Sequence, residues 1–226
     1  MGHKETITMD QLIFKFPFSK KYYEQDFFVS SNNFSAYKLV ESWPSWPGKW
    51  LNIFGPTGSG KTHLANILEK KIDKTKIINS RDVSNKTVQE LNNLDCLIID
   101  KFQNDIDEKL LYTILNQSKQ LDNHILINSN LSIKSISFKL EDLRSRMNSF
   151  LYIGIELPTD DLLKVIISKT LSDKQININP KISDFIINNV ERSYEKMFKF
   201  LKDIDELSLS TGKSININLI KKVLAK

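Results

Sequence analysis

A glycine-rich stretch carries the residue types that bind phosphate groups. Residues 55–62 read Gly-Pro-Thr-Gly-Ser-Gly-Lys-Thr and match the pattern G-x-x-x-x-G-K-[ST] at every specified position. Glycines let the backbone curl so that successive amides point at phosphate oxygens, and the N-terminus of a following helix favours anions. Lys61 can reach the outer phosphates, and the hydroxyl of Thr62 can bind Mg²⁺. The sequence therefore predicts a site for a nucleotide with Mg²⁺.

An acidic residue suited to the same metal ion follows at the end of an apolar run. Leu97-Ile98-Ile99-Asp100 has the form of a Walker B strand, whose terminal carboxylate holds Mg²⁺ through water. The next residue is Lys101, where efficient ATP-hydrolysing proteins carry a second carboxylate that positions the attacking water. An ammonium group cannot accept a proton from that water. We therefore expect nucleotide binding with very slow intrinsic ATP turnover.

Buried strands and helices alternate around these two motifs. A pattern of this kind is typical of an α/β domain with a parallel sheet, here of five strands, flanked by helices. The predicted strands are 50–54, 76–79, 96–100, 124–128 and 151–156, and the predicted helices are 32–43, 61–71 and 107–120.

The strand pattern fades after Pro158, and amphipathic helices follow. They are predicted at 161–174, 180–189, 193–208 and 219–224. We therefore expect an extended N-terminal arm over 1–25, a nucleotide-binding α/β domain over 26–158 and a small α-helical lid over 159–226.

The composition favours a cytoplasmic globular protein. Hydrophobic residues make up 40% and charged residues 26% of the 226 residues, which is enough apolar material to bury a core. No apolar run is long enough to span a bilayer. The single cysteine, Cys96, excludes an internal disulfide and reads as core filler. The net charge of +5 fits either a nucleic-acid face or a lysine-rich composition in which the lysines are scattered.

Several segments resemble the AAA+ module of the replication initiator DnaA and its Hda relatives. Asp26-Phe27-Phe28-Val29 resembles the DnaA segment that lies beside the adenine, and Trp43-Pro44-x-Trp46-Pro47 is more similar to Hda. The segment after the phosphate loop, His63-Leu64-Ala65, fits both. Asp142-Leu143-Arg144-Ser145-Arg146 resembles a segment whose final arginine acts as an arginine finger. The resemblance implies an AAA+ fold and ADP or ATP with Mg²⁺ as cofactor.

The resemblance also implies roles for individual residues. Arg146 would be an arginine finger acting in trans, Asn130 the sensor 1 residue that contacts the γ-phosphate, and Lys196 a substitute for the sensor 2 arginine. Plainer alternatives remain: Asn130 ends a strand, and Arg144 and Arg146 are solvated charges on a helix. The residues expected to bind nucleotide are Gly55, Pro56, Thr57, Gly58, Ser59, Gly60, Lys61, Thr62, His63, Asp100 and Lys196, with Thr62 and Asp100 also serving Mg²⁺.

The N-terminal arm holds an apolar cluster with a separate expected role. Gln11-Leu12-Ile13-Phe14 resembles the Q-L-x-[LF] peptide with which Hda binds the sliding clamp, the β subunit of DNA polymerase III. Gln11, Leu12 and Phe14 would make the contact. The alternative is that these side chains pack on the core of the protein itself.

The function implied is regulation of chromosome replication initiation. Bound to the clamp, the protein would promote hydrolysis of DnaA-bound ATP and so act as a negative regulator. The alternative is an AAA+ ATPase that loads a helicase on single-stranded DNA, for which Lys101 is unsuited. No helix-turn-helix follows the lid within the sequence, so sequence-specific DNA binding is not expected. The sequence does not decide whether the protein forms a homodimer.

Overall fold

The computed structural model describes residues 26–225, which form two compact units. One unit comprises 26–162 with 193–195, and the other comprises 163–192 with 196–225. The arm predicted over residues 1–25, including the clamp-binding motif, lies outside the described residues. Within 26–225, no helix combines the length and the apolar character that crossing a membrane requires.

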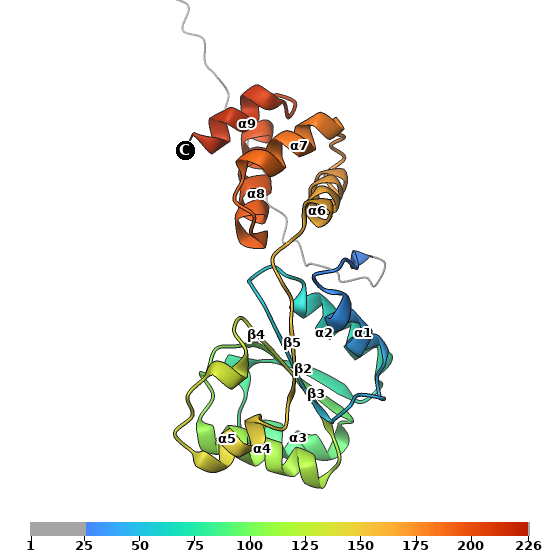
Figure 1. The fold of residues 1–226 in the computed structure, drawn as a ribbon, viewed down its shortest axis with the longest axis vertical. Coiled ribbons are helices and arrows are strands. Elements are labelled where there is room, and N and C mark those ends of the chain that lie inside the picture. Colours follow the sequence, from blue (N-terminus) through green and yellow to red (C-terminus); the bar gives the residue numbers. More distant parts are fainter. Residues whose placement is uncertain (1–25, 226) are drawn as a thin grey trace, which may run out of the picture. The chain divides into compact units, whose positions relative to one another are not determined.

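The first unit is built on a five-stranded sheet in which every pairing is parallel (Figure 1). The strand order is β2-β3-β4-β1-β5, so β1, the strand that precedes the phosphate loop, lies between β4 and β5. The carboxyl ends of β1, β3 and β4 therefore meet at one edge of the sheet. The strands are β1 (Trp50–Phe54), β2 (Thr75–Asn79), β3 (Cys96–Phe102), β4 (His124–Ser129) and β5 (Leu151–Gly154).

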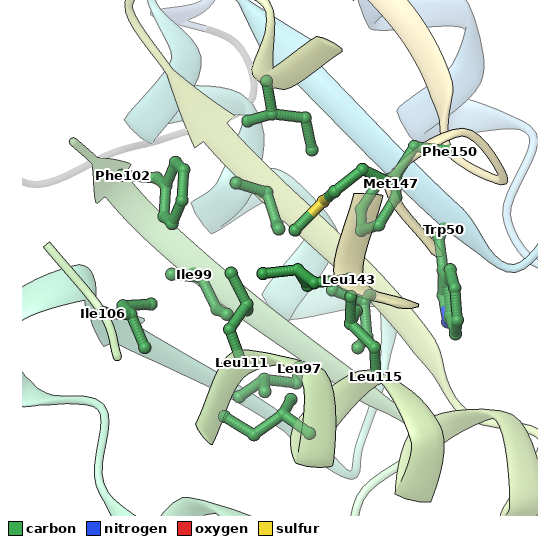
Figure 2. Packing of buried hydrophobic residues seen from close by; sticks show 14 of the residues in the cluster. Trp50, Leu97, Ile99, Phe102, Ile106, Leu111, Leu115, Leu143, Met147 and Phe150 are labelled. Atoms are coloured by element: carbon green, nitrogen blue, oxygen red, sulfur yellow. The ribbon is translucent and has the colours of Figure 1, made fainter. Parts of the chain in front are cut away.

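Helices cover both faces of this sheet, because side chains alternate between the faces along each strand. Leu97 and Ile99 of β3 pack with helices α4 and α5 (Figure 2). Cys96 and Ile98 of the same strand pack with α1 and α2 on the other face. The helices of this unit are α1 (Phe34–Glu41), α2 (Lys61–Lys71), α3 (Asn85–Glu90), α4 (Glu108–Gln120) and α5 (Glu141–Met147).

Cys96 belongs to the second of these apolar clusters and is fully buried. Burial raises the pKa of its thiol to about 12, with a smaller contribution from the carboxylate of Asp95. The side chain therefore stays a neutral thiol at physiological pH and packs as a small apolar group.

The second unit is helical and has its own apolar core. Its core lies between amphipathic helices, with Leu163, Ile186, Leu201 and Ile220 among the fully buried residues. Pro180 begins one helix at a position where a missing N–H costs nothing. The helices are α6 (Asp160–Ser172), whose first three residues belong to the sheet unit, α7 (Pro180–Asn189), α8 (Tyr194–Thr211) and α9 (Ile217–Leu224).

The predicted fold class is confirmed: a parallel five-stranded sheet flanked by helices, with a C-terminal helical unit. The predicted helix over 32–43 is shorter, because Asn32 and Asn33 form a turn instead. The helix predicted over 193–208 continues to Thr211, where Gly212 with φ of +62° ends it. The short helices α3 and α5 were not among the predicted elements.

Candidate nucleotide site

The phosphate loop connects β1 to α2 and can be formed only with glycine at two tight positions. At Gly60 the φ angle is +97°, and a Cβ atom would lie 2.9 Å from the ring of Phe27. At Gly55 a Cβ atom would lie 2.6 Å from the carbonyl oxygen of Ile155. A side chain at either position would clash with its neighbours, so the glycine spacing of the motif has a steric cause.

Lys61 begins α2 and turns its ammonium group back onto the loop. Its Nζ atom donates to the carbonyl oxygens of Gly55 at 2.7 Å and Pro56 at 3.0 Å. The residue is only 8% exposed. Burial lowers the pKa of Lys61 to about 8, although the carboxylate of Asp100 acts in the opposite direction. A buried cation among neutral carbonyls is suited to receive an anion such as a phosphate.

The two residues predicted to serve Mg²⁺ are in direct contact. The hydroxyl of Thr62 donates to Asp100 Oδ2 at 2.8 Å, and Asp100 lies two residues before the carboxyl end of β3. Oxygen ligands of this kind are those that Mg²⁺ prefers, and the ion usually keeps several waters and phosphate oxygens. The described residues contain no group of three or more His, Cys, Asp or Glu residues arranged for a metal. The pair therefore fits a metal ion that is held mainly by the nucleotide and water.

Asn128 joins these groups from β4, and the sequence analysis missed it. Its Nδ2 atom donates to Asp100 Oδ1 and to the carbonyl oxygen of Lys61, both at 3.0 Å. It is fully buried, and within 26–225 its Oδ1 atom and the hydroxyl of Ser59 have no hydrogen-bond partner. Such atoms call for a polar ligand. The available signal was an asparagine inside the apolar run Ile125-Leu126-Ile127.

Asn130, the predicted sensor 1 residue, lies two positions farther along the chain. It follows the end of β4 at Ser129 and is exposed. The structure thus brings Lys61, Thr62, Asp100 and Asn128 together and leaves Asn130 outside this network of hydrogen bonds. A role for Asn130 stays a prediction.

An aromatic cluster lies beside the start of α2. The ring of Phe27 stacks on Tyr37 with 5.8 Å between centroids and meets the edge of His63 at 5.3 Å. Phe27 also approaches Gly60 of the phosphate loop. The entry segment, predicted to lie beside the adenine, and His63, predicted to bind nucleotide, therefore share one cluster next to the loop.

Lys101 follows Asp100 with an unusual backbone conformation. Its φ angle is +57°, the side chain is exposed, and the pairing of β3 with β4 shifts register between Ile99 and Phe102. A bulge at this point redirects the side chain and interrupts the ladder. The position after Asp100 thus presents an exposed cation instead of a carboxylate.

Arg146 lies on α5, the helix that Leu143 and Met147 fix against α4 (Figure 2). Its Nε atom donates to Oδ1 of Asn116 on α4 at 2.9 Å, and its side chain is partly buried. Arg144 differs, because it contacts only Glu141 of its own helix at 3.3 Å and its side chain is 57% exposed. The arginine predicted to act as a finger is therefore the better oriented of the two.

The remaining predicted residues lie elsewhere. Lys196 is in the first turn of α8 and belongs to the helical unit. Gln11, Leu12 and Phe14 precede the described residues. Their predicted roles stay predictions.

Two protein-family models match the chain. The model described as "Hda, lid domain" matches residues 160–224, and one described as "RNA helicase" matches residues 51–143. The first match spans nearly all of α6 to α9, and the second spans the sheet from β1 to the middle of α5.

Among curated proteins the chain is similar to a DnaA. It is 26% identical to the chromosomal replication initiator protein DnaA of Buchnera aphidicola subsp. Cinara cedri, over 92% of this chain and 53% of that protein. The chain thus spans about half the length of this relative. It is also 24% identical to an uncharacterized protein of Haemophilus influenzae, over 76% of this chain and 80% of that protein.

Solved structures share the fold. Domain III of the Thermotoga maritima DnaA matches with a TM-score of 0.77 and 20% identity, over 93% of this chain and 98% of that one. The AMPPCP-bound DnaA of Aquifex aeolicus matches with a TM-score of 0.70 and 19% identity, over 86% of this chain and 68% of that one. The Thermotoga maritima RuvB Holliday junction branch migration motor matches with a TM-score of 0.60 and 21% identity, over 78% of this chain and 61% of that one. With an Hda lid match over 160–224 and sequence similarity to DnaA over most of its length, the chain is a DnaA-related, Hda-like protein with an AAA+ fold.

Proposed function

We propose that this chain is a nucleotide-bound regulator of chromosome replication initiation. It would bind the DNA polymerase III sliding clamp and promote the hydrolysis of ATP held by DnaA, which leaves the initiator in its inactive ADP form. The lid match and the DnaA relationship support a role in replication initiation. The clamp and DnaA as partners are our proposal.

The observation that carries the proposal is the pair Asp100–Lys101. The network of Lys61, Thr62, Asp100 and Asn128 suits a bound nucleotide, but an exposed cation stands where a base would orient water. A protein that binds nucleotide and hydrolyses it poorly suits a regulator better than a motor. The resident nucleotide, ADP or ATP, would then serve as a structural cofactor.

The proposed nucleotide is adenine-containing and is bound with Mg²⁺. Lys61 would hold the outer phosphates, and Thr62 and Asp100 would hold the metal ion, which neutralises phosphate charge when bound. Asn128 would keep the Asp100 carboxylate oriented through its Nδ2 atom, and its Oδ1 atom has no partner within residues 26–225. The AMPPCP complex of the Aquifex aeolicus DnaA supports this nucleotide class.

Arg146 would be the residue that promotes hydrolysis of the ATP bound to DnaA. A guanidinium group supplied in trans neutralises charge that develops on the transferred phosphoryl group, an effect worth roughly 10³–10⁵ in rate in other systems. Asn116 holds Nε of Arg146 and leaves the two terminal nitrogens of the guanidinium to act as donors. This contact is consistent with an arginine whose terminal nitrogens are available to a phosphate group of a bound partner.

Hydrolysis of DnaA-bound ATP tests the proposal directly. Purified protein, DnaA loaded with radiolabelled ATP and clamp loaded on DNA are combined, and released phosphate is followed. Acceleration that requires the clamp supports the proposal, and an unchanged rate contradicts it. The same assay without DnaA tests the alternative of a helicase-loading ATPase. Rapid DnaA-independent hydrolysis stimulated by single-stranded DNA would support that alternative.

A further inference from the structure

The net positive charge of the chain is concentrated in residues 207–226. This segment contains four lysines, Lys213, Lys221, Lys222 and Lys226, and no aspartate or glutamate. The rest of the chain holds 28 of the 32 basic residues and all 27 acidic residues, so its net charge is only +1. Lysines occur throughout the chain, but over residues 1–206 taken together the acidic residues nearly offset the basic ones.

Three of these lysines surround one hollow in the helical unit. The hollow lies where the chain passes from α8 into α9 and has a volume of about 480 Å³. We call it the lysine hollow; its lining residues are Lys213, Asn216, Asn218, Leu219, Lys221 and Lys222. Five of the six side chains end in amide or ammonium donors, and no carboxylate is among them.

The three ammonium groups are not neutralised within the described part of the chain. Elsewhere in the helical unit, Lys164, Lys174 and Lys202 form ion pairs with Asp184, Asp205 and Glu206. None of the three lysines of the hollow has such a pair within residues 26–225. The hollow is therefore a local concentration of uncompensated positive charge, which attracts anions.

The central part of the apolar side of α9 is already used inside the protein. Leu219 and Ile220 are buried, and Val223 packs against the same cluster. A basic amphipathic helix binds a membrane by burying its whole apolar face in lipid, but Leu219 and Ile220 of this helix are buried in its own core, and the exposed apolar residues Ile217 and Leu224 lie at its two ends. Between these ends the exposed surface of α9 carries lysine and asparagine side chains, which suit a hydrated polyanion.

We propose that the lysine hollow binds the phosphate backbone of double-stranded DNA without sequence preference. Lysine contacts phosphate as a point charge, and asparagine amides can donate to phosphate oxygens, so the contacts carry no base information. Affinities of this kind lie on the order of 10⁻⁴–10⁻⁶ M at physiological salt. The hollow shares no residue with the nucleotide site and stands without the function proposed above.

Fluorescence anisotropy with a labelled DNA duplex of mixed sequence tests the proposal on the full chain. The triple variant Lys213→Gln, Lys221→Gln, Lys222→Gln should bind at least about tenfold more weakly at low salt. The slope of log affinity against log salt should become shallower by roughly 2.7, since each phosphate contact contributes about 0.9. An unchanged melting temperature and unchanged nucleotide binding show that the variant is folded.

A second triple variant controls for net charge. Lys74→Gln, Lys139→Gln and Lys181→Gln remove the same charge from exposed positions outside the hollow and should keep most of the affinity. Equal losses in both triples, or wild-type protein that does not bind duplex DNA at low salt, overturn the proposal. Binding to anionic phospholipid vesicles without binding to duplex also overturns it.

Discussion

At the scale of single residues, the nucleotide site is organised around one buried ammonium group. Lys61 loses hydration on burial, and the two carbonyl oxygens it contacts only partly replace that hydration. The charged form is therefore disfavoured, and the pKa falls to about 8. A phosphate brought to this position restores a counter-charge, so binding of the anion and protonation of Lys61 support each other.

This coupling makes nucleotide affinity depend on pH. Below about pH 8 Lys61 carries its charge before the nucleotide arrives, whereas above it a proton must be taken up on binding. We expect affinity measured by calorimetry to weaken as pH rises through about 8, and Lys61→Ala to lose most of the affinity and this pH dependence. Unchanged affinity in the alanine variant would contradict the assignment of the loop. The same lowered pKa means that Lys61 destabilises the nucleotide-free fold below pH 8 and that this cost disappears between pH 8 and 10.5.

Substitutions of Lys101 test whether the missing carboxylate at this position limits ATP hydrolysis. Its left-handed backbone conformation suits asparagine and aspartate, so Lys101→Asp and Lys101→Asn differ only in the presence of a carboxylate. We expect very slow ATP turnover in the wild-type protein and in the Lys101→Asn variant. General bases contribute roughly 10²–10⁴-fold, and Lys101→Asp should gain toward the low end of that range in a steady-state phosphate-release assay. Ordinary AAA+ turnover by the wild-type protein, or equal rates in the two variants, would refute this account.

At the scale of elements, two helices combine to present one arginine. Leu143 and Met147 anchor the short helix α5 in the core beside α4 (Figure 2). That anchoring places Arg146 within hydrogen-bond distance of Asn116, thirty positions earlier in the chain. A hydrogen bond that involves a charged group contributes about 1.5–3 kcal/mol, which is enough to fix one rotamer of Arg146 but small beside the contribution of the buried core.

Asn116 should therefore matter for the action on DnaA more than for stability. We expect Arg146→Ala to abolish stimulation of hydrolysis of DnaA-bound ATP and Asn116→Ala to reduce it several-fold. Asn116→Asp, which keeps the accepting oxygen, should retain it. Nucleotide affinity and melting temperature should stay close to wild type in all three variants. Full stimulation by Arg146→Ala would show that Arg146 is not the arginine finger and make Arg144 the next candidate. Full stimulation by Asn116→Ala would show that Asn116 does not orient the arginine.

The elements that could be predicted from the sequence are those with a strong local pattern. The runs Trp50–Phe54 and Cys96–Asp100 are apolar enough to mark buried strands, and the glycine spacing fixes the loop between strand and helix. Helix α3 was missed because Asn-Lys-Thr-Val-Gln-Glu has no apolar period, and its start depends on the capping contacts between Ser84 and Thr87. Asn128 was missed because its partners come from β3 and α2, and such proximity is not visible along one strand.

At the scale of the whole molecule, the tasks proposed for the phosphate loop, Arg146, the lysine hollow and the clamp motif fall on different residues. The sheet unit holds the phosphate loop, Asp100 and Arg146, and the helical unit holds Lys196 and the lysine hollow. The predicted clamp motif lies in residues 1–25. Because no task shares its residues with another, substitution in one part should leave the others measurable. This separation lets the proposed activities be tested one at a time in the intact protein.

The arm provides the last test, because its sequence predicts a contact with a partner protein. In the clamp hypothesis Gln11 fixes the register by hydrogen bonding, and Leu12 and Phe14 enter an apolar groove. Burying two such side chains is worth roughly 1.5–3 kcal/mol each. Fixing the segment on the clamp opposes this by a few kcal/mol, so the net gain from these two side chains is small and the affinity should be weak.

Replacing Gln11, Leu12 and Phe14 together by alanine distinguishes this contact from packing within the protein. If the motif binds the clamp, the triple variant loses clamp binding in surface plasmon resonance and keeps the melting temperature of the wild type. If the side chains pack on the core instead, the melting temperature falls, since burying each one contributes kilocalories, and clamp binding does not change. Alanine at Lys4, Glu5 and Thr6, in the same arm but outside the motif, should alter neither quantity. With that control, a selective loss of clamp binding assigns the motif to the clamp.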